Sequence, residues 1–349
     1  MKSILVSLLG FSWLCIAFTG FNSHSPTPYI LPEIGEIGEL NIPLDNPMTE
    51  EGVALGRLLF YEELLSSDGS FSCGSCHKQE LAFTDGLARA IGYRGDTLDR
   101  NTMTLVNLAW QQEFFWDGRV KTLEALIEVP ITDPREMGQD TVVLVQLLQN
   151  HEHYPRYFGQ AFGSETVTFE NVSKAIAQFL RTIVSPGIKL PDSLLNIPPD
   201  NVSETEFVSS QFYDNTMRAV YFRLADMCGS CHSSQVYGGL STNFNLVNSA
   251  DSLLKVPPLL NILLTGPYMH KGQFSSLEEV INHYDQHIEA LAYLNRKGNE
   301  APMVSKLSAY DKQYLPEFLT LFVDSNILLN DSYGNPKEAA DYEWPAFLH

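Results

Sequence analysis

The sequence Cys73-Gly74-Ser75-Cys76-His77 decides the interpretation of this chain, and it recurs once as Cys228-Gly229-Ser230-Cys231-His232. In a C-x-x-C-H motif two thiols form thioether bonds to a porphyrin, and the following imidazole binds its iron as in c-type haem proteins. A C-x-x-C pair alone would also fit a thioredoxin-like or a zinc site. Two copies, each followed directly by histidine, favour two covalently bound haem c groups, with His77 and His232 as iron ligands.

The chain has five cysteines, and the fifth, Cys15, lies in an apolar N-terminal stretch. Residues 1–22 are predicted to be a secretory signal peptide, because Lys2 precedes an almost wholly apolar run and small polar residues follow it. A retained membrane anchor is the alternative, and lipidation at Cys15 is disfavoured by the bulky residues before it. Export to the periplasm agrees with the motifs, since thioether attachment of haem takes place outside the cytoplasm.

Composition is that of a globular protein: 349 residues, 44% hydrophobic and 18% charged, which is enough for two domains. The formal net charge of −20 disfavours nucleic acid as a partner. The same charge could attract a basic electron-donor protein over long range. Solubility is the simpler reason for most of it.

We expect a mainly α fold, because no stretch alternates with the period of a strand. Each C-x-x-C-H motif falls in its own half, which predicts two cytochrome c-like domains packed with an interface between them. Prolines and a glycine at 186–199 mark the boundary between the domains. The predicted parts are an extended N-terminal arm (23–47), an N-terminal haem domain (48–186), a C-terminal haem domain (187–328) and a C-terminal tail (329–349).

Capping residues and apolar periodicity predict several helices. Long turn-rich loops are expected at 83–101 and 132–138, and the first of them would suit the edge of a haem. The predicted helices are one capped by Thr49 that runs to Leu59, Thr122 to Val129 stopped by Pro130, one opened by Asp140, one opened by Thr168, and Phe207 to Met227.

A further helix begins at the capping box Ser276-Leu277-Glu278-Glu279 and is predicted to run to Leu291. Tyr284 falls on its apolar stripe, whereas His283 lies about 100° away around the axis and is expected to point elsewhere. His287 shares the side of Tyr284 and is a rival candidate ligand. From spacing alone, Tyr284 is more often a core residue than an iron ligand.

Several motifs occur in a fixed order between about Leu55 and Val323. Besides the two C-x-x-C-H sequences they are Arg100-Asn101, Phe115-Trp116-Asp117-Gly118-Arg119, Pro130, Glu136-Met137, and Pro267-Tyr268-Met269-His270 with Leu277-Glu278. In these motifs the chain resembles the bacterial di-haem cytochrome c peroxidases and the related MauG-type enzymes. The resemblance implies that the N-terminal haem reacts with hydrogen peroxide and that the C-terminal haem receives electrons.

The resemblance also implies roles for individual residues. Glu136 matches a distal carboxylate that moves protons during O–O cleavage, although by itself it would be read as a solvated loop acid. Trp116 matches an aromatic side chain between the two haems. Asn101, with the carbonyl groups of Thr265 and Pro267, matches a calcium site, and these oxygen donors suit a hard cation.

Three positions depart from the peroxidase pattern. Tyr93 stands where the peroxidases have a histidine that blocks the peroxide haem, so this haem is either open at rest or bound by the phenolate. Leu126 stands in place of a distal glutamine. Tyr284 aligns with a methionine ligand in the peroxidases and with an axial tyrosine in MauG, which favours Tyr284 as the second haem's sixth ligand and as a cause of low potential.

Three functions follow from these observations. The first is a peroxidase that reduces hydrogen peroxide with electrons from a small cytochrome c or cupredoxin. The second is a MauG-like oxidase that modifies an aromatic residue of an exported partner protein. The third is a di-haem electron carrier without enzymatic activity, in which Tyr93 closes the first haem. A homodimer is left open.

Overall fold

The structure is a computed structural model that describes residues 25–32, 40–186, 220, 228, 232, 254–287 and 306–338. In these ranges the regular structure consists of α-helices and short 3₁₀-helices, and strand pairing is limited to isolated bridges. The prediction of a mainly α fold is therefore confirmed for the described part of the chain. The predicted signal peptide, the 187–199 linker and the predicted helix before Cys228 lie outside it, apart from Val220. None of the described helices is long and apolar enough to cross a bilayer.

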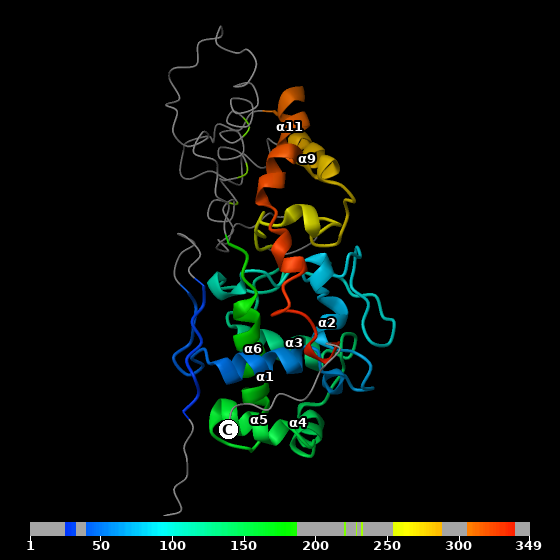
Figure 1. Ribbon diagram of the computed structural model, residues 1–349. Helices are drawn as coiled ribbons and strands as arrows, with labels where there is room; N and C mark the ends of the chain where they lie inside the picture. Colours follow the sequence, from blue (N-terminus) through cyan, green and yellow to red (C-terminus); the bar gives the residue numbers. More distant parts are fainter. Residues whose placement is uncertain are drawn as a thin grey trace, which may run out of the picture.

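The N-terminal half forms one helical body, shown in blue to green in Figure 1. Its central pair, α1 and α6, pack closely: a Cβ on Gly56 of α1 would lie 1.9 Å from the carbonyl oxygen of Ala175 in α6. Only glycine allows this approach. The body comprises α1 (Glu50–Phe60), the one-turn α2 (Cys73–Cys76), α3 (Leu123–Thr132), α4 (Thr141–Gln149), α5 (Tyr154–Phe162) and α6 (Phe169–Thr182).

The predicted N-terminal caps are confirmed, since a side-chain oxygen accepts a backbone N–H at each of them. They are Thr49, Asp140 and Thr168, and Thr122, predicted as the first residue of its helix, is likewise the N-cap of α3. The prediction that Pro130 ends its helix was wrong, because α3 continues to Thr132. A proline in the last turn removes one intrahelical hydrogen bond, and Asp133 N–H still closes the turn on Val129.

Helix α5 was not predicted. Its buried residues, Tyr154, Tyr157, Phe158 and Ala161, do follow helical spacing, and Gly163 ends it with φ at 74°. Two histidines and a proline at its start obscured the pattern.

The C-terminal half forms a second body with its own hydrophobic core, in yellow to orange (Figure 1). Helices α9 (Leu277–Gln286) and α11 (Ala309–Leu319) pack against each other. The capping box of Ser276 and Glu279 is confirmed. The helix ends at Gln286 rather than at Leu291, because the N–H of His287 turns back to the carbonyl groups of His283 and Tyr284. Residues 288–291 lie outside the described ranges.

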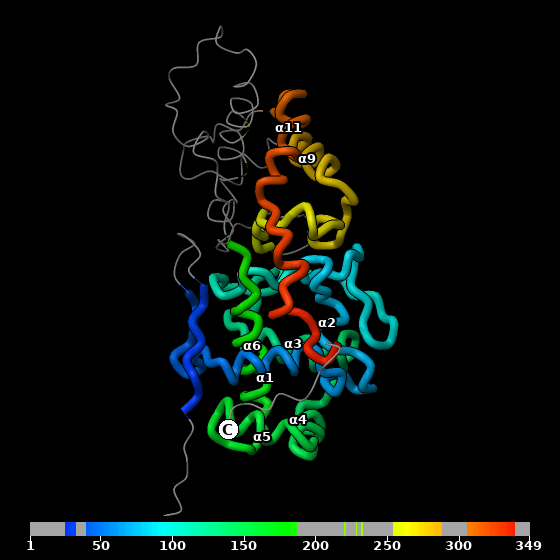
Figure 2. Tube along the Cα trace, in the orientation of Figure 1, coloured from blue at the N-terminus to red at the C-terminus, as the bar shows by residue number. Residues whose placement is uncertain are grey.

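The last described segment, 325–338, returns to the first body, as the red trace shows in Figure 2. Ile327 and Tyr333 belong to the first body's core. Tyr61 Oη donates a hydrogen bond of 2.7 Å to the carbonyl of Tyr333, and Arg57 Nε donates one of 2.8 Å to that of Gly334. Residues 329–338, the described part of the predicted tail, therefore connect the second body to the first.

The described parts of the N-terminal arm also lie on the first body. Tyr29 N–H donates to the carbonyl of Met48 (3.0 Å), and Asn41 N–H donates to that of Ala109 (2.8 Å). The buried guanidinium of Arg181 in α6 donates to the carbonyl of Asn41 (3.2 Å). The arm is therefore part of the packed structure around α6.

Candidate functional site

The first cavity lies beside the first C-x-x-C-H motif and has a volume of about 420 Å³. Cys73 and Cys76 stand at the two ends of the single turn α2, and His77 follows at its C-cap, so all three side chains border the cavity. The ring nitrogen Nδ1 of His77 lies 2.9 Å from the carbonyl oxygen of Phe83. A proton on Nδ1 fixes the ring and leaves Nε2 available for a metal.

Burial shifts the pKa values of the three side chains of this motif. Burial lowers the pKa of His77, which keeps the imidazole neutral as iron ligation requires. Burial also raises the pKa of both Cys73 and Cys76 to about 12. Two thiols on a single helical turn, followed by a neutral imidazole with Nε2 available, fit a haem c held by two thioethers.

Glu136 borders the same cavity, on the loop after α3. Burial raises the pKa of its carboxyl to about 7, and Asp133 adds to the rise while Arg119 and Arg135 oppose it. The loop is fixed because Glu136 N–H donates to Asp133 and the carbonyl of Glu136 accepts from Tyr93 N–H, at 2.9 and 3.0 Å. A carboxyl with this pKa can both accept and donate a proton near neutral pH.

Tyr93 does not border the first cavity, although its neighbour Gly92 does. Its hydroxyl lies over Gly138, where a Cβ would come within 2.8 Å of it, and Arg94 covers its ring at 5.1 Å. Leu126 borders the cavity, as do Met103 and Met137. Among the described residues, His77 is the only histidine in this wall, and no tyrosine takes part in it.

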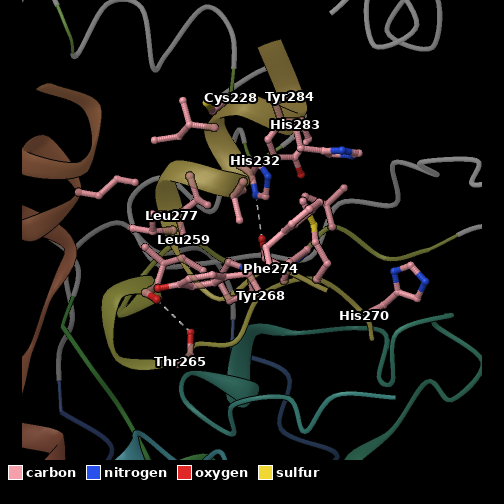
Figure 3. A pocket seen from close by; sticks show the side chains of 18 of the residues that line it. Cys228, His232, Leu259, Thr265, Tyr268, His270, Phe274, Leu277, His283 and Tyr284 are labelled. Carbon is pink, nitrogen blue, oxygen red and sulfur yellow. Dashed lines mark hydrogen bonds between the residues drawn. The ribbon is translucent and has the colours of Figure 1, made fainter. Parts of the chain in front are cut away.

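The second cavity, of about 600 Å³, lies beside Cys228 and His232, while Cys231 is outside the described residues. His232 Nδ1 lies 2.8 Å from the carbonyl oxygen of Pro257 (Figure 3), again leaving Nε2 free for a metal. Burial lowers the pKa of His232 to about 4. In both motifs, therefore, a backbone carbonyl group orients the histidine and burial lowers its pKa.

Helix α9 presents Tyr284 to the second cavity, close to Cys228 and His232 in Figure 3. His287 borders the cavity as well, with Nδ1 2.8 Å from the carbonyl oxygen of His283. The expectation that His283 points elsewhere was wrong: it also borders this cavity, because its ring packs on Phe274 at 5.0 Å.

A shared wall separates the two cavities, and seven residues border both of them. Trp116 is one, and its Nε1–H donates to the carbonyl oxygen of Asn101 at 2.9 Å. His270, which borders the second cavity alone, lies edge-on to Trp116 with 6.3 Å between ring centroids. The seven residues, called the partition below, are Asn101, Thr102, Met103, Thr104, Gln111, Trp116 and Lys255.

Sequence reasoning assigned no role to Lys255 or Gln111. The signal for Lys255 is a lone lysine in the apolar stretch Leu254-Lys255-Val256-Pro257-Pro258. Gln111 carries no comparable signal.

Asn101, Thr265 and Pro267 all border the second cavity. Among the described residues, none donates a hydrogen bond to Asn101 Oδ1 or to the carbonyl oxygens of Thr265 and Pro267. Groups of three or more acidic, histidine or cysteine side chains that could hold a metal are absent from the described ranges. These three residues offer neutral oxygen donors, which fit a hard cation such as calcium.

Comparison with known proteins agrees with this architecture. The family model described as di-haem cytochrome c peroxidase matches residues 50–195. The methylamine utilization protein MauG of Methylorubrum extorquens is 36% identical over 259 residues, which are 69% of this chain and 70% of that protein. The cytochrome c551 peroxidase of Nitrosomonas europaea is 30% identical, over 76% of this chain and 80% of its own.

Among solved structures, a MauG-like protein associated with microbial copper homeostasis has a TM-score of 0.68 and 28% sequence identity, covering 88% of this chain and 98% of its own. Its likeness extends over both bodies. Family and geometry agree, and the chain belongs to the di-haem cytochrome c peroxidase family, which includes MauG, as an oxidoreductase that acts on peroxide.

Proposed function

We propose that the chain reduces hydrogen peroxide to water at the first cavity, with electrons that arrive through the second. Each cavity would hold one haem c, attached through Cys73 and Cys76 or through Cys228 and Cys231. The observation that carries the proposal is the half-buried carboxyl of Glu136 on the cavity of His77, with its pKa raised to about 7.

Haem iron in the first cavity would supply the coordination position for peroxide and the path for two electrons. Glu136 would take the proton from the peroxide oxygen nearer the iron and return it to the far oxygen, which leaves as water. Two electrons and two further protons complete the conversion of one peroxide into two water molecules. The role of Glu136 is thus that of a general base and then a general acid.

His77 and His232 would be the proximal ligands, and Tyr284 the sixth ligand of the second haem. Trp116 borders both cavities, which supports a role in the transfer of electrons between them. Asn101, Thr265 and Pro267 would hold one calcium ion beside the partition. The two haem domains would correspond to 48–186 and 187–328, with residues 325–338 packed back on the first.

The electron donor would be a small cytochrome c or cupredoxin outside the cytoplasm. The apolar start of the chain at 1–22 supports export to the periplasm. The strongly acidic composition would favour association with a basic donor.

The test is steady-state oxidation of a reduced small cytochrome by peroxide, using purified protein that contains two haems. We expect turnover that saturates with peroxide and slows at high salt, since screening weakens attraction to a basic donor. Absence of turnover with any cytochrome or cupredoxin would contradict the proposal.

A second candidate is a MauG-like oxidase that uses peroxide to modify an aromatic residue of an exported partner. The specific observation in its favour is Tyr284, a phenol on the second cavity where a low-potential iron would result. A peroxide-dependent change in the mass of a partner's aromatic residues, with poor oxidation of small cytochromes, would select this function.

A further inference from the structure

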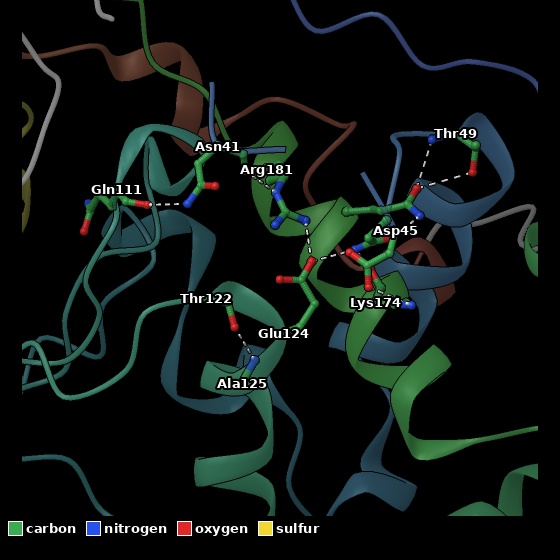
Figure 4. Close-up of polar contacts among 11 residues, drawn as sticks. Asn41, Asp45, Thr49, Gln111, Thr122, Glu124, Ala125, Lys174 and Arg181 are labelled. Carbon is green, nitrogen blue, oxygen red and sulfur yellow. Dashed lines mark hydrogen bonds and ion pairs between the residues drawn. The ribbon is translucent and has the colours of Figure 1, made fainter. Parts of the chain in front are cut away.

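Lys255 is a buried cation in the partition. The residue is 4% exposed and borders both cavities. Its backbone N–H donates to the carbonyl oxygen of Trp116 at 2.7 Å, and its Nζ donates to Gln111 Oε1 at 2.8 Å. Gln111 is held in turn by Asn41, whose amide donates to its carbonyl at 3.3 Å (Figure 4). The ammonium group is therefore fastened at a defined position between the cavities.

This ammonium forms no ion pair with a carboxylate among the described residues. Glu113 acts on it only from a distance and is itself ion-paired with Lys121. Burial lowers the pKa of Lys255 to about 8, with Glu113 opposing the shift. A buried ammonium with a single neutral hydrogen-bond partner is costly in free energy, so an anion entering either cavity would be strongly favoured here.

We infer that the ammonium of Lys255 binds a haem propionate and thereby anchors a haem at the partition. The inference rests on the proposed function, in which both cavities hold haem. Each haem c carries two propionate carboxylates, and an ammonium–carboxylate hydrogen bond is among the strongest available to a protein. The propionate could come from the haem of either cavity, and the experiment distinguishes the two.

A cation beside a haem stabilises the reduced iron more than the oxidised iron, because reduction adds one negative charge. Lys255 should therefore raise the midpoint potential of the haem that it contacts. Arginine preserves this charge, whereas methionine preserves the length and apolar stem without it.

The test compares the di-haem holoprotein with Lys255→Met, Lys255→Arg and the control Lys306→Met, which removes an exposed lysine. Potentiometric titration followed by visible absorbance resolves the two haems. We expect Lys255→Met to lower one midpoint potential, and Lys255→Arg and Lys306→Met to leave both near the wild-type values. A shift at the haem of His77 assigns the propionate to the first cavity, and a shift at the haem of His232 assigns it to the second.

A Lys255→Met protein with two haems, wild-type peroxide turnover and unchanged potentials would overturn this inference while leaving the proposed function in place. A wild-type protein with one haem, or one inert to peroxide, would overturn the proposed function instead.

Infrared redox difference spectra of wild-type protein labelled with ¹⁵N-lysine give a second readout that does not depend on the folding of any variant. We expect an ammonium band that shifts on haem reduction. A spectrum without a lysine band would overturn the inference.

Discussion

The two cavities share a partition and the same histidine arrangement, but they differ in the groups around them. The first presents the carboxyl of Glu136, and no histidine or tyrosine other than His77 borders it among the described residues. The second presents three candidate ligands in addition to His232: Tyr284 and His283 from α9, and His287 at its C-cap. One motif can therefore serve two roles, because the elements packed opposite it determine whether a reactant or a side chain meets the iron.

We expect the largest effect on peroxide turnover from a substitution of Glu136. Glu136→Gln should lower peroxide turnover by about 10²–10⁴-fold, because the amide cannot carry the proton between the oxygens. Glu128→Gln, on the exposed side of α3, is the matched control and should keep wild-type turnover. Steady-state kinetics with a reduced cytochrome measure both variants, and equal rates for Glu136→Gln and wild type would remove Glu136 from the mechanism.

The pH dependence of the reaction with peroxide also tests the role of Glu136. Because the pKa of Glu136 is raised to about 7, the carboxyl is protonated below that pH and cannot accept the proton of peroxide. The second-order rate with peroxide should therefore rise as pH increases through about 7 and level off above it. Glu136→Gln should show no such step, and an unchanged profile in that variant would assign the titration to another group.

The second prediction separates the stability of the first body from its chemistry. Arg181 is 1% exposed, and its guanidinium pairs with Glu124 at 2.9 Å (Figure 4). The amide of Asn46 in the arm also donates to Glu124, at 2.7 Å. Arg181→Met leaves a partly buried carboxylate without its cation and should cost about 3 kcal/mol in free energy of unfolding.

Chemical denaturation followed by circular dichroism measures this cost, with the exposed Arg156→Met as the control. Both variants should keep wild-type haem spectra when folded. A changed haem spectrum in folded Arg181→Met would show that the arm and the first cavity are coupled.

The third prediction alters the second cavity alone. Tyr284→Met replaces a hard phenolate by a soft thioether and should raise the potential of the second haem by about 0.1 V, or roughly 2 kcal/mol. Tyr268→Phe, on the same cavity, is a control that should leave the potential nearly unchanged. If the potential moved in neither variant, His287 or His283 would become the preferred ligand.

The smallest effect is expected in the partition. Trp116→Phe removes the indole and its hydrogen bond to Asn101, and should slow electron transfer between the cavities about tenfold, equivalent to about 1.4 kcal/mol. Trp110→Phe, a buried tryptophan in another cluster, is the matched control. Stopped-flow reduction of each haem measures the rate of electron transfer. Equal rates in Trp116→Phe and wild type would show that the electrons do not pass through Trp116.

The sequence predicted the elements whose signals are local. The capping residues Thr49, Asp140 and Thr168 predicted the starts of their helices. The two C-x-x-C-H motifs predicted both cavities. Val172, Ile176 and Phe179, which are buried in α6, recur at helical spacing in the sequence. Each of these features depends on residues that are close together in the sequence.

What the sequence could not predict depends on contacts between distant segments. Tyr93 turns away from the first cavity because the loop at 136–138 packs against it. Residues 325–338 return to α1, and Lys255 enters the partition through its bond to Trp116. No local pattern encodes these approaches, which arise only when the two bodies pack together.

Low-temperature EPR of the oxidised resting protein tests the central difference between the cavities most directly. We expect one high-spin ferric signal, from an iron with an open position beside Glu136, and one low-spin signal from the iron of His232. Two low-spin signals that peroxide leaves unchanged would contradict it.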